Sequence, residues 1–411
     1  MAFSSFSFDN RLNAGIKSCG YETPTPIQTQ AIPHVLKGYD VMGLAQTGTG
    51  KTAAFALPTL QRLLDERLPA KGAPKILVLA PTRELALQIH ESFIALGKQT
   101  GIRSAAVIGG VGMSPQVKAF AHSRIIVACP GRLVRLMKMN AISLNQINTL
   151  VLDEADRMLD MGFMPDIKRI LAKLPVKRQN LLFSATMPAD IRKLAEKILN
   201  QPKTVQVANT VSVKSVGHIQ YKAPNHLKLS LLGKVLAATD HKSVLIFTRT
   251  KHKAKNLARK LSNGGENCTF LQGNMSQGQR QRALDGFRNG QFNIMVATDI
   301  AARGIDCDRI SHVINFDMPD TVENYTHRIG RTGRAGRSGT AVSFVTPEER
   351  SQIKDIERVM RIKIEQDTID GFDHNAVSTK IDTRKPSRRP PKNRFSNSRK
   401  RSSNRGRRSA A

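Results

Sequence analysis

Short apolar segments rich in β-branched residues recur along the chain, and each is followed by a polar loop and a helical pattern. Hydrophobicity within these segments is continuous rather than alternating, which is typical of strands covered on both faces. Such strands occur in parallel sheets with helices packed on either side, so the sequence predicts an α/β fold. The predicted strands are residues 41–45, 75–80, 124–129, 149–153, 180–186, 243–248, 293–298, 312–316 and 341–345.

The predicted strands form two series, which flank a polar segment, QVANTVSVKSV, at residues 206–216. We expect this segment to be a linker between two α/β domains of similar layout. With 411 residues, of which 40% are apolar, the chain is long enough to build both cores. The predicted boundaries are 1–205 for the first domain, 206–216 for the linker, 217–370 for the second domain and 371–411 for a tail.

The chain is strongly basic, with 64 Lys and Arg, 32 Asp and Glu, and a formal net charge of +32. This charge favours a polyanionic partner, either a nucleic acid or an anionic membrane surface. Twelve basic residues and no acid lie between Arg384 and Arg408, so residues 371–411 are predicted to form a disordered basic tail. The tail would serve either as a solubilising segment or as an electrostatic tether for RNA or DNA. We favour the tether, because a charge of +20 remains without those twelve residues.

Several classes of protein are disfavoured by the sequence. No apolar run approaches the ~18–20 residues that span a bilayer, and the opening MAFSSFSFDN does not resemble a secretory signal. The four cysteines form no C-x-x-C pair and have no histidine cluster beside them. We therefore expect buried small hydrophobes in a reducing cytoplasm, rather than a zinc site or disulfides.

A glycine-rich loop, AQTGTGKT, lies between the first predicted strand and a helical pattern. Glycines let backbone N–H groups approach phosphates, Lys51 supplies a charge for the β- and γ-phosphates, and the Thr52 hydroxyl can bind Mg²⁺. The first glycine of the general G-x-x-x-x-G-K-[ST] pattern is Ala45 here, and a flexible turn is the alternative interpretation. The strand–loop–helix context favours a phosphate loop. Its residues are Ala45, Gln46, Thr47, Gly48, Thr49, Gly50, Lys51 and Thr52.

The segment LVLDEAD places three acids, Asp153, Glu154 and Asp156, at the end of a predicted strand. Ligands bind at the carboxyl ends of strands in open parallel sheets, so these acids are expected beside the phosphate loop. Mg²⁺ uses few protein carboxylates together with phosphates and water, which makes Asp153 its expected ligand alongside Thr52. Glu154 is then the candidate that orients the attacking water. The alternative is an acidic turn that caps the following helix.

These motifs make the chain resemble a DEAD-box ATP-dependent RNA helicase of superfamily 2. Residues 153–156 read DEAD, and the resemblance covers about residues 3–365 with the motifs in family order. Within the family the chain is most similar to the bacterial RhlE-type group. The resemblance implies two tandem RecA-like domains, each a mainly parallel sheet flanked by helices. It also implies ATP and Mg²⁺ as cofactors, and RNA-stimulated ATP hydrolysis coupled to local, non-processive unwinding of short RNA duplexes and remodelling of RNA or RNA–protein complexes.

The resemblance also assigns roles around the nucleotide. GYETPTPIQ at 20–28 is similar to the adenine-reading Q motif, in which Gln28 bonds the adenine edge while Tyr21 and Phe3 pack on its ring. ATDIAARGID at 297–306 resembles the motif whose Asp306 meets the ribose, and HRIGRTGR at 327–334 resembles the arginine-finger motif, with Arg331 and Arg334 as the fingers. A guanidinium delivered by a second domain stabilises charge on the γ-phosphoryl group only when the domains close. The implied coupling residues are Asp156, Ser184, Thr186 and His327.

RNA contacts are implied in both domains, and they involve phosphate and 2′-OH groups without reading sequence. The implied residues are Thr82, Arg83, Gly110 and Arg132 in the first domain, and Thr248, Arg249, Gly273 and Thr298 in the second. Two departures from the family pattern bear on RNA affinity or coupling. Cys129 in CPGR replaces a threonine, and residues 272–274 read QGN where the family has HGD.

Two functions of other classes compete with the helicase interpretation. A translocating DNA helicase is disfavoured by the Q motif and by DEAD itself. An ATP-gated RNA-binding or annealing chaperone, in which the tail does the work, is disfavoured by the intact phosphate-loop, acid and finger residues. Ribosome biogenesis and RNA decay are both compatible with the resemblance. We therefore expect RNA, ribosomal precursor particles or RNA-decay proteins as partners of a cytoplasmic monomer, and no membrane.

Overall fold

The computed structural model describes residues 2–46, 48–67, 71–207, 216–302, 307, 309–333, 338–374 and 376. The predicted tail beyond Ala376, most of the predicted linker, and Thr47, Asp306 and Arg334 therefore lie outside the described residues. Residues 1–375 form one compact unit. Within it we call residues 2–207 the N-terminal lobe and residues 216–374 the C-terminal lobe, because each contains its own sheet.

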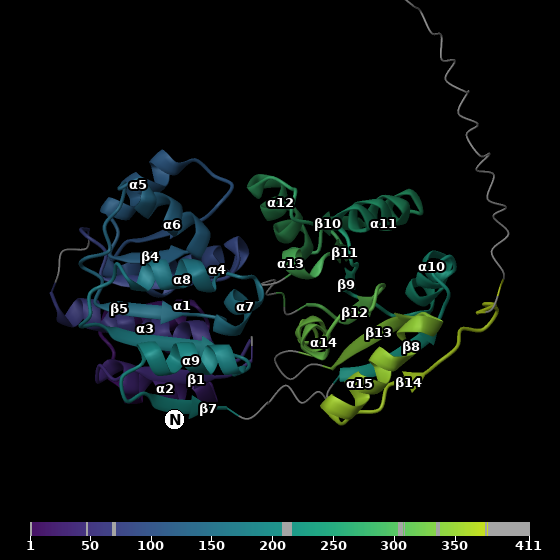
Figure 1. Ribbon diagram of the computed structural model, residues 1–411, viewed down its shortest axis with the longest axis horizontal. Coiled ribbons are helices and arrows are strands. Elements are labelled where there is room, and N and C mark those ends of the chain that lie inside the picture. Colours follow the sequence, from purple (N-terminus) through teal and green to yellow (C-terminus); the bar gives the residue numbers. More distant parts are fainter. Residues whose placement is uncertain are drawn as a thin grey trace, which may run out of the picture. The chain divides into compact units, whose positions relative to one another are not determined.

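The N-terminal lobe is built on a seven-stranded sheet in the order β3-β4-β2-β5-β6-β1-β7 (Figure 1). Every pairing in it is parallel. The strands are β1 Val41–Leu44, β2 Ile76–Leu79, β3 Ser104–Val107, β4 Ile125–Ala128, β5 Thr149–Leu152, β6 Gln179–Ser184 and β7 Lys203–Gln206.

The C-terminal lobe repeats this plan with a second seven-stranded sheet, ordered β10-β11-β9-β12-β13-β8-β14 and again parallel throughout. The strands are β8 Val216–Lys222, β9 Val244–Phe247, β10 Cys268–Leu271, β11 Ile294–Ala297, β12 His312–Asn315, β13 Gly339–Val345 and β14 Glu365–Gln366.

Helices cover both faces of each sheet. Those of the N-terminal lobe are α1 Asn10–Ser18, α2 Pro26–Leu36, α3 Lys51–Asp65, α4 Arg83–Leu96, α5 Met113–Ala121, α6 Pro130–Lys138, α7 Ala155–Asp160, α8 Met164–Leu171 and α9 Ala189–Ile198. Those of the C-terminal lobe are α10 Lys228–Ala238, α11 Lys251–Asn263, α12 Gln277–Arg288, α13 Asp299–Ala302, α14 Val322–Ile329 and α15 Arg350–Met360. Short 3₁₀ turns occupy Phe3–Phe6, Lys98–Thr100 and Pro347–Glu349.

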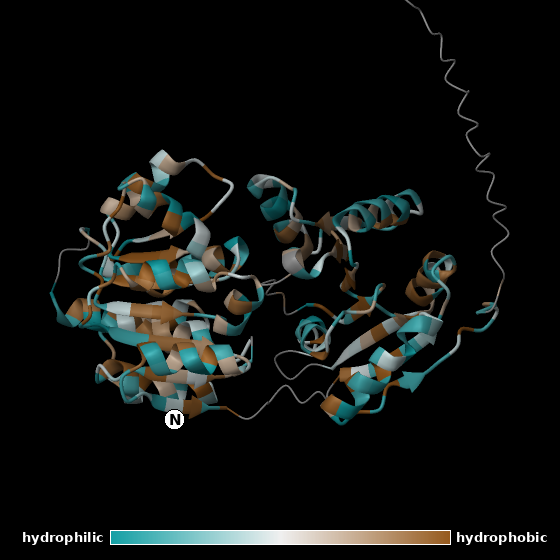
Figure 2. Cartoon of the chain, in the orientation of Figure 1, coloured by the Kyte–Doolittle hydropathy of each residue, from teal (hydrophilic) through white to brown (hydrophobic). Residues whose placement is uncertain are grey.

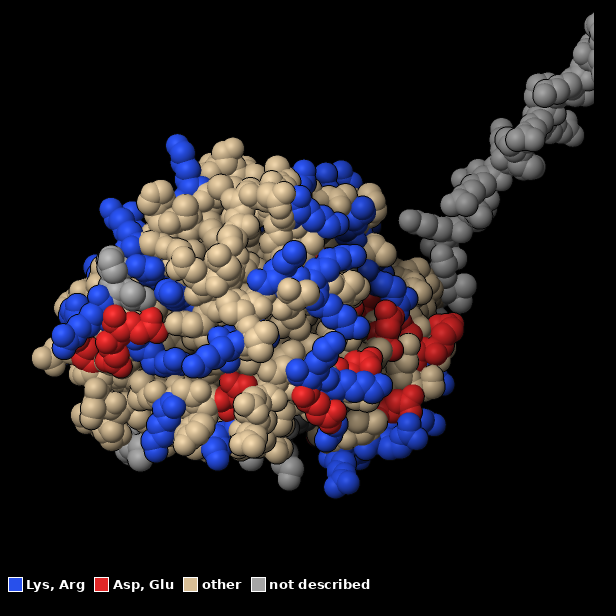
Figure 3. Space-filling view, turned by 60° about the vertical axis from the view of Figure 1, so that its left-hand side comes forward, with Lys and Arg blue, Asp and Glu red and all other residues tan. Residues whose placement is uncertain are grey.

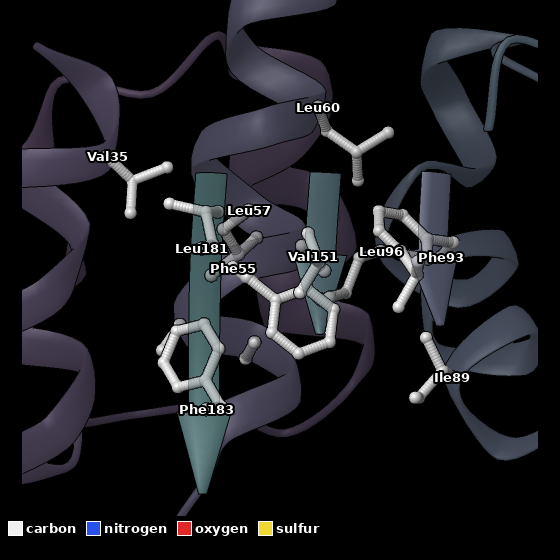
Figure 4. Packing of buried hydrophobic residues seen from close by; sticks show 14 of the residues in the cluster. Val35, Phe55, Leu57, Leu60, Ile89, Phe93, Leu96, Val151, Leu181 and Phe183 are labelled. Atoms are coloured by element: carbon white, nitrogen blue, oxygen red, sulfur yellow. The ribbon is translucent and has the colours of Figure 1, made fainter. Parts of the chain in front are cut away.

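The two faces of the N-terminal sheet support separate hydrophobic clusters. Helices α1 to α4 pack on one face, where Phe55, Phe93 and Phe183 meet in the middle of the cluster (Figure 4). Helices α6 to α9 pack on the other face through residues such as Leu133, Met158 and Ile170. Strands β2 and β4 consist of apolar residues throughout, while polar residues lie mainly on the outer sides of the helices (Figure 2). Burial on both faces is the physical reason for the continuous apolar runs in the sequence.

All nine predicted strands are present, and the mainly parallel α/β architecture is confirmed. The sequence pattern missed β3, β7, β8, β10 and β14. Four of these lie at sheet edges and the fifth, β8, lies next to an edge. Burial is partial or alternating in β3, β7, β8 and β10, and both residues of β14 are exposed. An edge strand is covered less fully than a central one and therefore lacks the continuous apolar run.

The predicted domain boundaries fall close to ordered structure. Gln206 ends β7 and Val216 begins β8, so both ends of the predicted linker belong to strands. Packing continues past residue 370, because Phe372 lies against the hydrophobic cluster of the C-terminal lobe and His374 contacts the carbonyl of Lys222. Among the described residues, no helix is long and apolar enough to cross a membrane.

Two helical glycines differ sharply in their surroundings. A Cβ on Gly15 in α1 would lie 2.1 Å from the carbonyl oxygen of Leu96, whereas a Cβ on Gly233 in α10 would meet no atom within 4 Å. We expect Gly15→Ala to lower the free energy of unfolding by about 2 kcal/mol, because α1 must move away from α4. Gly233→Ala should raise it by about 0.5–1 kcal/mol through helix propensity. Urea unfolding of both variants measures this, and equal effects would contradict the packing of α1 on α4.

Cys129 occupies the N-cap position of α6, and its side chain makes no capping hydrogen bond. A threonine hydroxyl at this position can accept from a free N–H in the first turn, so Cys129→Thr should raise the free energy of unfolding by about 1 kcal/mol. Thermal unfolding measures the gain. Cys268→Thr is the matched control, because that thiol lies in β10 and caps no helix. Equal shifts in the two variants would show that the effect does not come from the cap.

Candidate functional site

The carboxyl edge of the N-terminal sheet carries the predicted motifs side by side. The phosphate loop follows β1 and the DEAD acids follow β5, while the sequence SAT at residues 184–186, here called the SAT segment, starts at the last residue of β6. These three strands are neighbours in the sheet. Beyond β5, the edge continues with Thr82 after β2, Cys129 after β4 and Gly110 after β3. The predicted nucleotide residues and the predicted RNA residues therefore occupy opposite ends of one edge, as parallel topology requires.

The phosphate loop is folded around its own lysine. Lys51 is 5% exposed, and its Nζ donates a hydrogen bond of 2.7 Å to the carbonyl of Ala45. Gly48 and Gly50 have φ angles of 85° and 92°, which favour glycine. Gly50 is also required for space, since a Cβ there would lie 2.5 Å from Gln28 Nε2. The loop leads directly into α3, whose N-terminal N–H groups are suited to phosphate oxygens.

Gln28 joins the predicted adenine-reading segment to this loop. Its Nε2 donates to the Gly50 carbonyl at 3.1 Å, and its Oε1 accepts from the Thr25 N–H at 3.0 Å. Each end of the amide makes one such bond and retains capacity for another, as adenine recognition needs. Phe3 is buried and stacks on the partly exposed Tyr21, with ring centroids 6.3 Å apart. Phe3 and Tyr21 are thus in contact with each other, and Gln28 is in contact with the phosphate loop.

The acids Asp153 and Glu154 are both buried, at 2% and 3% exposure. Burial raises the pKa of Asp153, and the charge of Lys51 acts in the opposite direction. Glu154 has a left-handed backbone with φ of 53°, which is uncommon for a residue with a side chain. Its Oε2 accepts a 2.7 Å hydrogen bond from Arg157 Nη1 within a buried ion pair. Arg157, which no sequence motif singled out, thereby fixes the orientation of the Glu154 carboxylate.

Asp156 links the DEAD segment to SAT. Its Oδ2 accepts hydrogen bonds from the Ala185 N–H, the Thr186 N–H and the Thr186 hydroxyl, at 3.1, 2.8 and 2.9 Å. Ser184 completes the connection, because its hydroxyl accepts from the Asp156 N–H at 3.2 Å and donates to the Thr186 carbonyl at 2.8 Å. The contact between these predicted coupling residues is therefore present.

Three predicted RNA residues of the N-terminal lobe form a cluster. The Arg83 guanidinium lies against the backbone of Gly110, where a Cβ would be 2.3 Å from Arg83 Nη1 and where φ is 85°. Arg132 donates from Nη1 to the carbonyl of Val111 at 2.9 Å. Burial lowers the pKa of Arg132, and the nearby Arg135 and Arg83 lower it further. Thr82 is buried and caps α4 by accepting from the Leu85 N–H.

The corresponding residues of the C-terminal lobe follow β9, β11 and β10, which have the same neighbour order as β2, β4 and β3. Arg249 is half-exposed, with carboxylates of Asp320 and Glu349 at 3.7 and 3.5 Å. Gly273 is exposed, and a Cβ there would meet no atom within 4 Å. Thr298 caps the short helix α13 through its carbonyl. Thr248 is fully buried, so its hydroxyl does not face solvent in this structure.

The predicted arginine-finger segment begins within α14. The Arg328 guanidinium donates to the two carboxylate oxygens of Asp299 at 2.6 and 2.7 Å and to Asn315 Oδ1 at 3.0 Å. These contacts hold it within the C-terminal lobe. Arg331 is 3% exposed and donates from Nε to the carbonyl of His327 at 3.3 Å. Burial lowers the pKa of His327, and the charge of Arg157 lowers it further. Arg334 lies outside the described residues.

One buried ion pair was not predicted. Arg280 in α12 donates from Nε to Glu84 Oε1 at 2.6 Å, and both side chains are almost fully buried. Arg280 also donates to the carbonyls of Gln272 and Ala301. The only feature of the sequence that could have indicated this ion pair is the charged Glu84 next to the apolar pattern of α4. It does not identify a partner 196 positions away along the chain.

Two family models match the chain in the order of its lobes. Residues 25–194 match the DEAD/DEAH box helicase family, and residues 227–336 match the helicase conserved C-terminal domain. The first match contains the phosphate loop and the DEAD acids, and the second contains Thr248 and Arg331.

Curated relatives and solved structures agree with these matches. The chain is 42% identical over 369 residues to the ATP-dependent RNA helicase DeaD of Buchnera aphidicola, which covers 89% of this chain and 60% of that protein. It is 40% identical over 366 residues to the ATP-dependent RNA helicase CshA of Limosilactobacillus reuteri, which covers 89% of this chain and 73% of that protein. The chain thus spans somewhat less than two thirds of the first relative and somewhat more of the second.

Among solved structures, Saccharomyces cerevisiae Dbp5 bound to RNA and ADP BeF3 superposes with a TM-score of 0.81 at 32% identity, over 89% of this chain and 95% of that one. Mss116p bound to ssRNA and AMP-PNP gives a TM-score of 0.79 at 26% identity, over 89% and 78% of the two chains. Both sheets are therefore RecA-like, and the predicted fold is confirmed. With its motifs, its fold and its relatives in agreement, the chain belongs to the DEAD-box family of ATP-dependent RNA helicases.

Proposed function

We propose that this chain hydrolyses ATP when bound to RNA, and uses the cycle to open short RNA duplexes locally and to remodel RNA or RNA–protein complexes. One observation carries the proposal. The phosphate loop, SAT and DEAD segments follow three neighbouring strands, and Arg83, Gly110 and Arg132 cluster farther along the same edge. Nucleotide and RNA would therefore be held by one rigid sheet. The name of the relative DeaD, an ATP-dependent RNA helicase, and the RNA-bound structure of Dbp5 support the same function.

ATP would be held first by its base and its phosphates. Gln28 has one unused hydrogen-bonding position on each side of its amide for the adenine edge. Lys51 would exchange its bond with the Ala45 carbonyl for the β- and γ-phosphates, which offer a charge-assisted contact. Asp306, predicted at the ribose, and Arg334, predicted as a second finger, complete the proposed nucleotide set.

Mg²⁺ fits the residues at this site. Asp153 is a buried carboxylate facing the charge of Lys51, and the described residues contain no cluster of three or more His, Cys, Asp or Glu side chains able to form a cage. Such a donor set suits Mg²⁺, which binds through one or two carboxylates together with phosphates. Asp153 and the Thr52 hydroxyl would hold the ion. When bound, it would neutralise charge on the β- and γ-phosphates.

Hydrolysis would depend on Glu154 and Arg331. The Arg157 ion pair fixes one oxygen of Glu154, so the carboxylate is oriented before a water molecule arrives. Arg331 would stabilise the charge that develops on the γ-phosphoryl group. Asp156 is bonded to Ser184 and Thr186, so a shift of the acids at the nucleotide would move SAT as well. This connection supports the proposed coupling role.

RNA would be held through its backbone. Arg83 and Arg132 lie next to exposed or partly exposed glycine-rich backbone, an arrangement suited to phosphate and 2′-OH contacts. On the face shown in Figure 3, basic side chains are spread widely and acids form smaller groups. Sequence-independent binding to a polyanion follows from such a surface. The twelve basic residues between Arg384 and Arg408 would add a tether.

The proposal also covers the subgroup of the family, the cellular compartment, the oligomeric state and the partners. We place the chain nearest to the RhlE-type group because of its basic C-terminal segment. The four cysteines are free thiols, as in proteins of the reducing cytoplasm, where we expect this chain to act as a monomer. Ribosomal precursor particles and RNA-decay complexes are the partner classes proposed.

Glu154→Gln should separate binding from hydrolysis. Glutamine keeps an oxygen that can accept from Arg157 but loses the charge that activates water, so RNA-stimulated ATPase activity should fall by about 10²–10⁴-fold. ATP-dependent RNA binding should persist, because the binding residues are untouched. Steady-state ATPase assays and RNA titrations with a non-hydrolysable ATP analogue measure the two effects. Glu196→Gln, an exposed change on α9, is the control. Unchanged ATPase activity in Glu154→Gln would overturn the proposed role.

Comparing RNA with DNA as activators of ATP hydrolysis tests which nucleic acid the protein uses. Single-stranded RNA should stimulate ATP hydrolysis at least about tenfold more than DNA of the same sequence, because 2′-OH contacts distinguish the two. The measurement is the ATPase rate against activator concentration at one fixed salt concentration, since backbone contacts are salt-dependent. Equal stimulation by DNA would favour a DNA-dependent enzyme.

A further inference from the structure

A groove on the N-terminal lobe takes no part in the site described above. It has a volume of about 650 Å³ and lies between α8 and α9, with the end of α7 contributing to its wall. Both helices pack on the same face of the sheet (Figure 1). The apolar residues that line the groove are Leu159, Met164, Leu171, Ala172, Leu194 and Ile198. Leu194 is buried, while the others remain partly or largely exposed.

The lining residues occupy one face of each helix. Met164, Lys168 and Leu171 recur at helical spacing along α8, and Lys193, Leu194 and Lys197 do so along α9. Each helix therefore presents an apolar stripe bordered by lysine. Apolar surface that remains accessible between two helices, with polar groups at its rim, is typical of interaction sites.

The rim of the groove is positively charged. Four basic residues, Lys168, Arg178, Lys193 and Lys197, line it together with a single acid, Asp190. Asp190 lies 3.9 Å from Lys193, and both side chains are largely exposed, so this pair neutralises little. Within the described part of the chain, no carboxylate forms an ion pair with Lys168 or Lys197. The groove thus combines an apolar floor with uncompensated positive charge.

We propose that this groove is a docking site for an acidic amphipathic helix of a protein partner. Large apolar side chains on one face of that helix would fill the floor, and its acidic flanks would pair with the lysines of the rim. The occupant would contact α7, which contains Asp156, and α9, which follows Thr186 in the chain.

Other occupants fit the groove less well. Grooves for single-stranded nucleic acid combine basic residues with aromatic platforms, and none of the residues lining this groove is aromatic. The chain's own C-terminal segment carries twelve basic residues and no acid between Arg384 and Arg408, so the rim repels it. A second copy of a chain with a net charge of +32 meets the same repulsion.

Selection from a random 12-residue peptide display library tests the proposal. The full chain is the bait, and clones that also bind the Lys168→Glu/Lys197→Glu double variant are discarded. These two lysines are exposed and lie on opposite walls, so their replacement leaves the core intact. We expect the enriched peptides to be acidic, with large apolar residues spaced three or four positions apart. Their affinity, measured by fluorescence anisotropy, should fall at least about tenfold in the double variant.

Lys173→Glu/Lys177→Glu is the matched control, because these lysines are exposed but do not line the groove. It should leave peptide affinity within about twofold of the unmodified chain. Failure to enrich acidic apolar peptides, or equal losses in the two double variants, would overturn the proposal. A loss of RNA affinity specific to Lys168→Glu/Lys197→Glu would reassign the groove to RNA. Self-association abolished by the same variant would reassign it to a second copy of the chain.

Discussion

Parallel strand pairing is the constraint on which the rest of this molecule depends. Leu44 at the end of β1 pairs with Ser184 at the end of β6, and Leu152 at the end of β5 pairs with Leu182 two residues earlier in β6. The chain therefore leaves three neighbouring strands at nearly the same level of one edge. The loops that follow have to meet there, which brings together residues more than a hundred positions apart in sequence. The same rule puts the predicted RNA residues after the next strands of that edge.

Almost every buried charged side chain at this edge of the sheet has a hydrogen-bond or ion-pair partner that offsets the cost of its burial. Lys51 donates to a carbonyl, Glu154 is paired with Arg157, and Asp156 accepts bonds from three donors of the SAT segment. Asp153 has less compensation, since the backbone N–H of Glu154 supplies its one hydrogen bond among the described contacts, and burial raises its pKa. An incompletely compensated buried carboxylate next to a phosphate loop is consistent with the proposed binding of a cation together with the nucleotide. The least compensated of these buried charges, that of Asp153, is therefore the one at which the proposed cation would bind.

How much the sequence predicts follows from how local each signal is. The central strands and the phosphate loop are encoded in runs of adjacent residues, so they are readable, and so is Asp153 at a strand end. The strands β3, β7 and β10 are not predicted from the sequence, because a strand at a sheet edge needs no continuous apolar run. The Glu84–Arg280 ion pair and the Arg157–Glu154 ion pair were missed for another reason. Each depends on how the side chains meet in the folded structure, which no spacing of residues in the sequence indicates. The roles of Phe3, Tyr21 and Gln28 came from family resemblance, and physical reasoning alone would not have found them.

The two lobes share a scaffold but prepare their RNA residues differently. In the N-terminal lobe the Arg83 guanidinium packs on the backbone of Gly110, where no larger residue fits. In the C-terminal lobe Arg249 lies among Asp320 and Glu349, and Gly273 is open to solvent. If these residues bind RNA as proposed, phosphate would meet a pre-formed cationic cluster in the first lobe and would displace carboxylates in the second. Because ion pairs at 3.5–3.7 Å on a half-exposed side chain are weak, that exchange costs little. Under the proposed function, the N-terminal cluster would thus accept RNA phosphate without losing a carboxylate partner, whereas Arg249 would accept it by exchange.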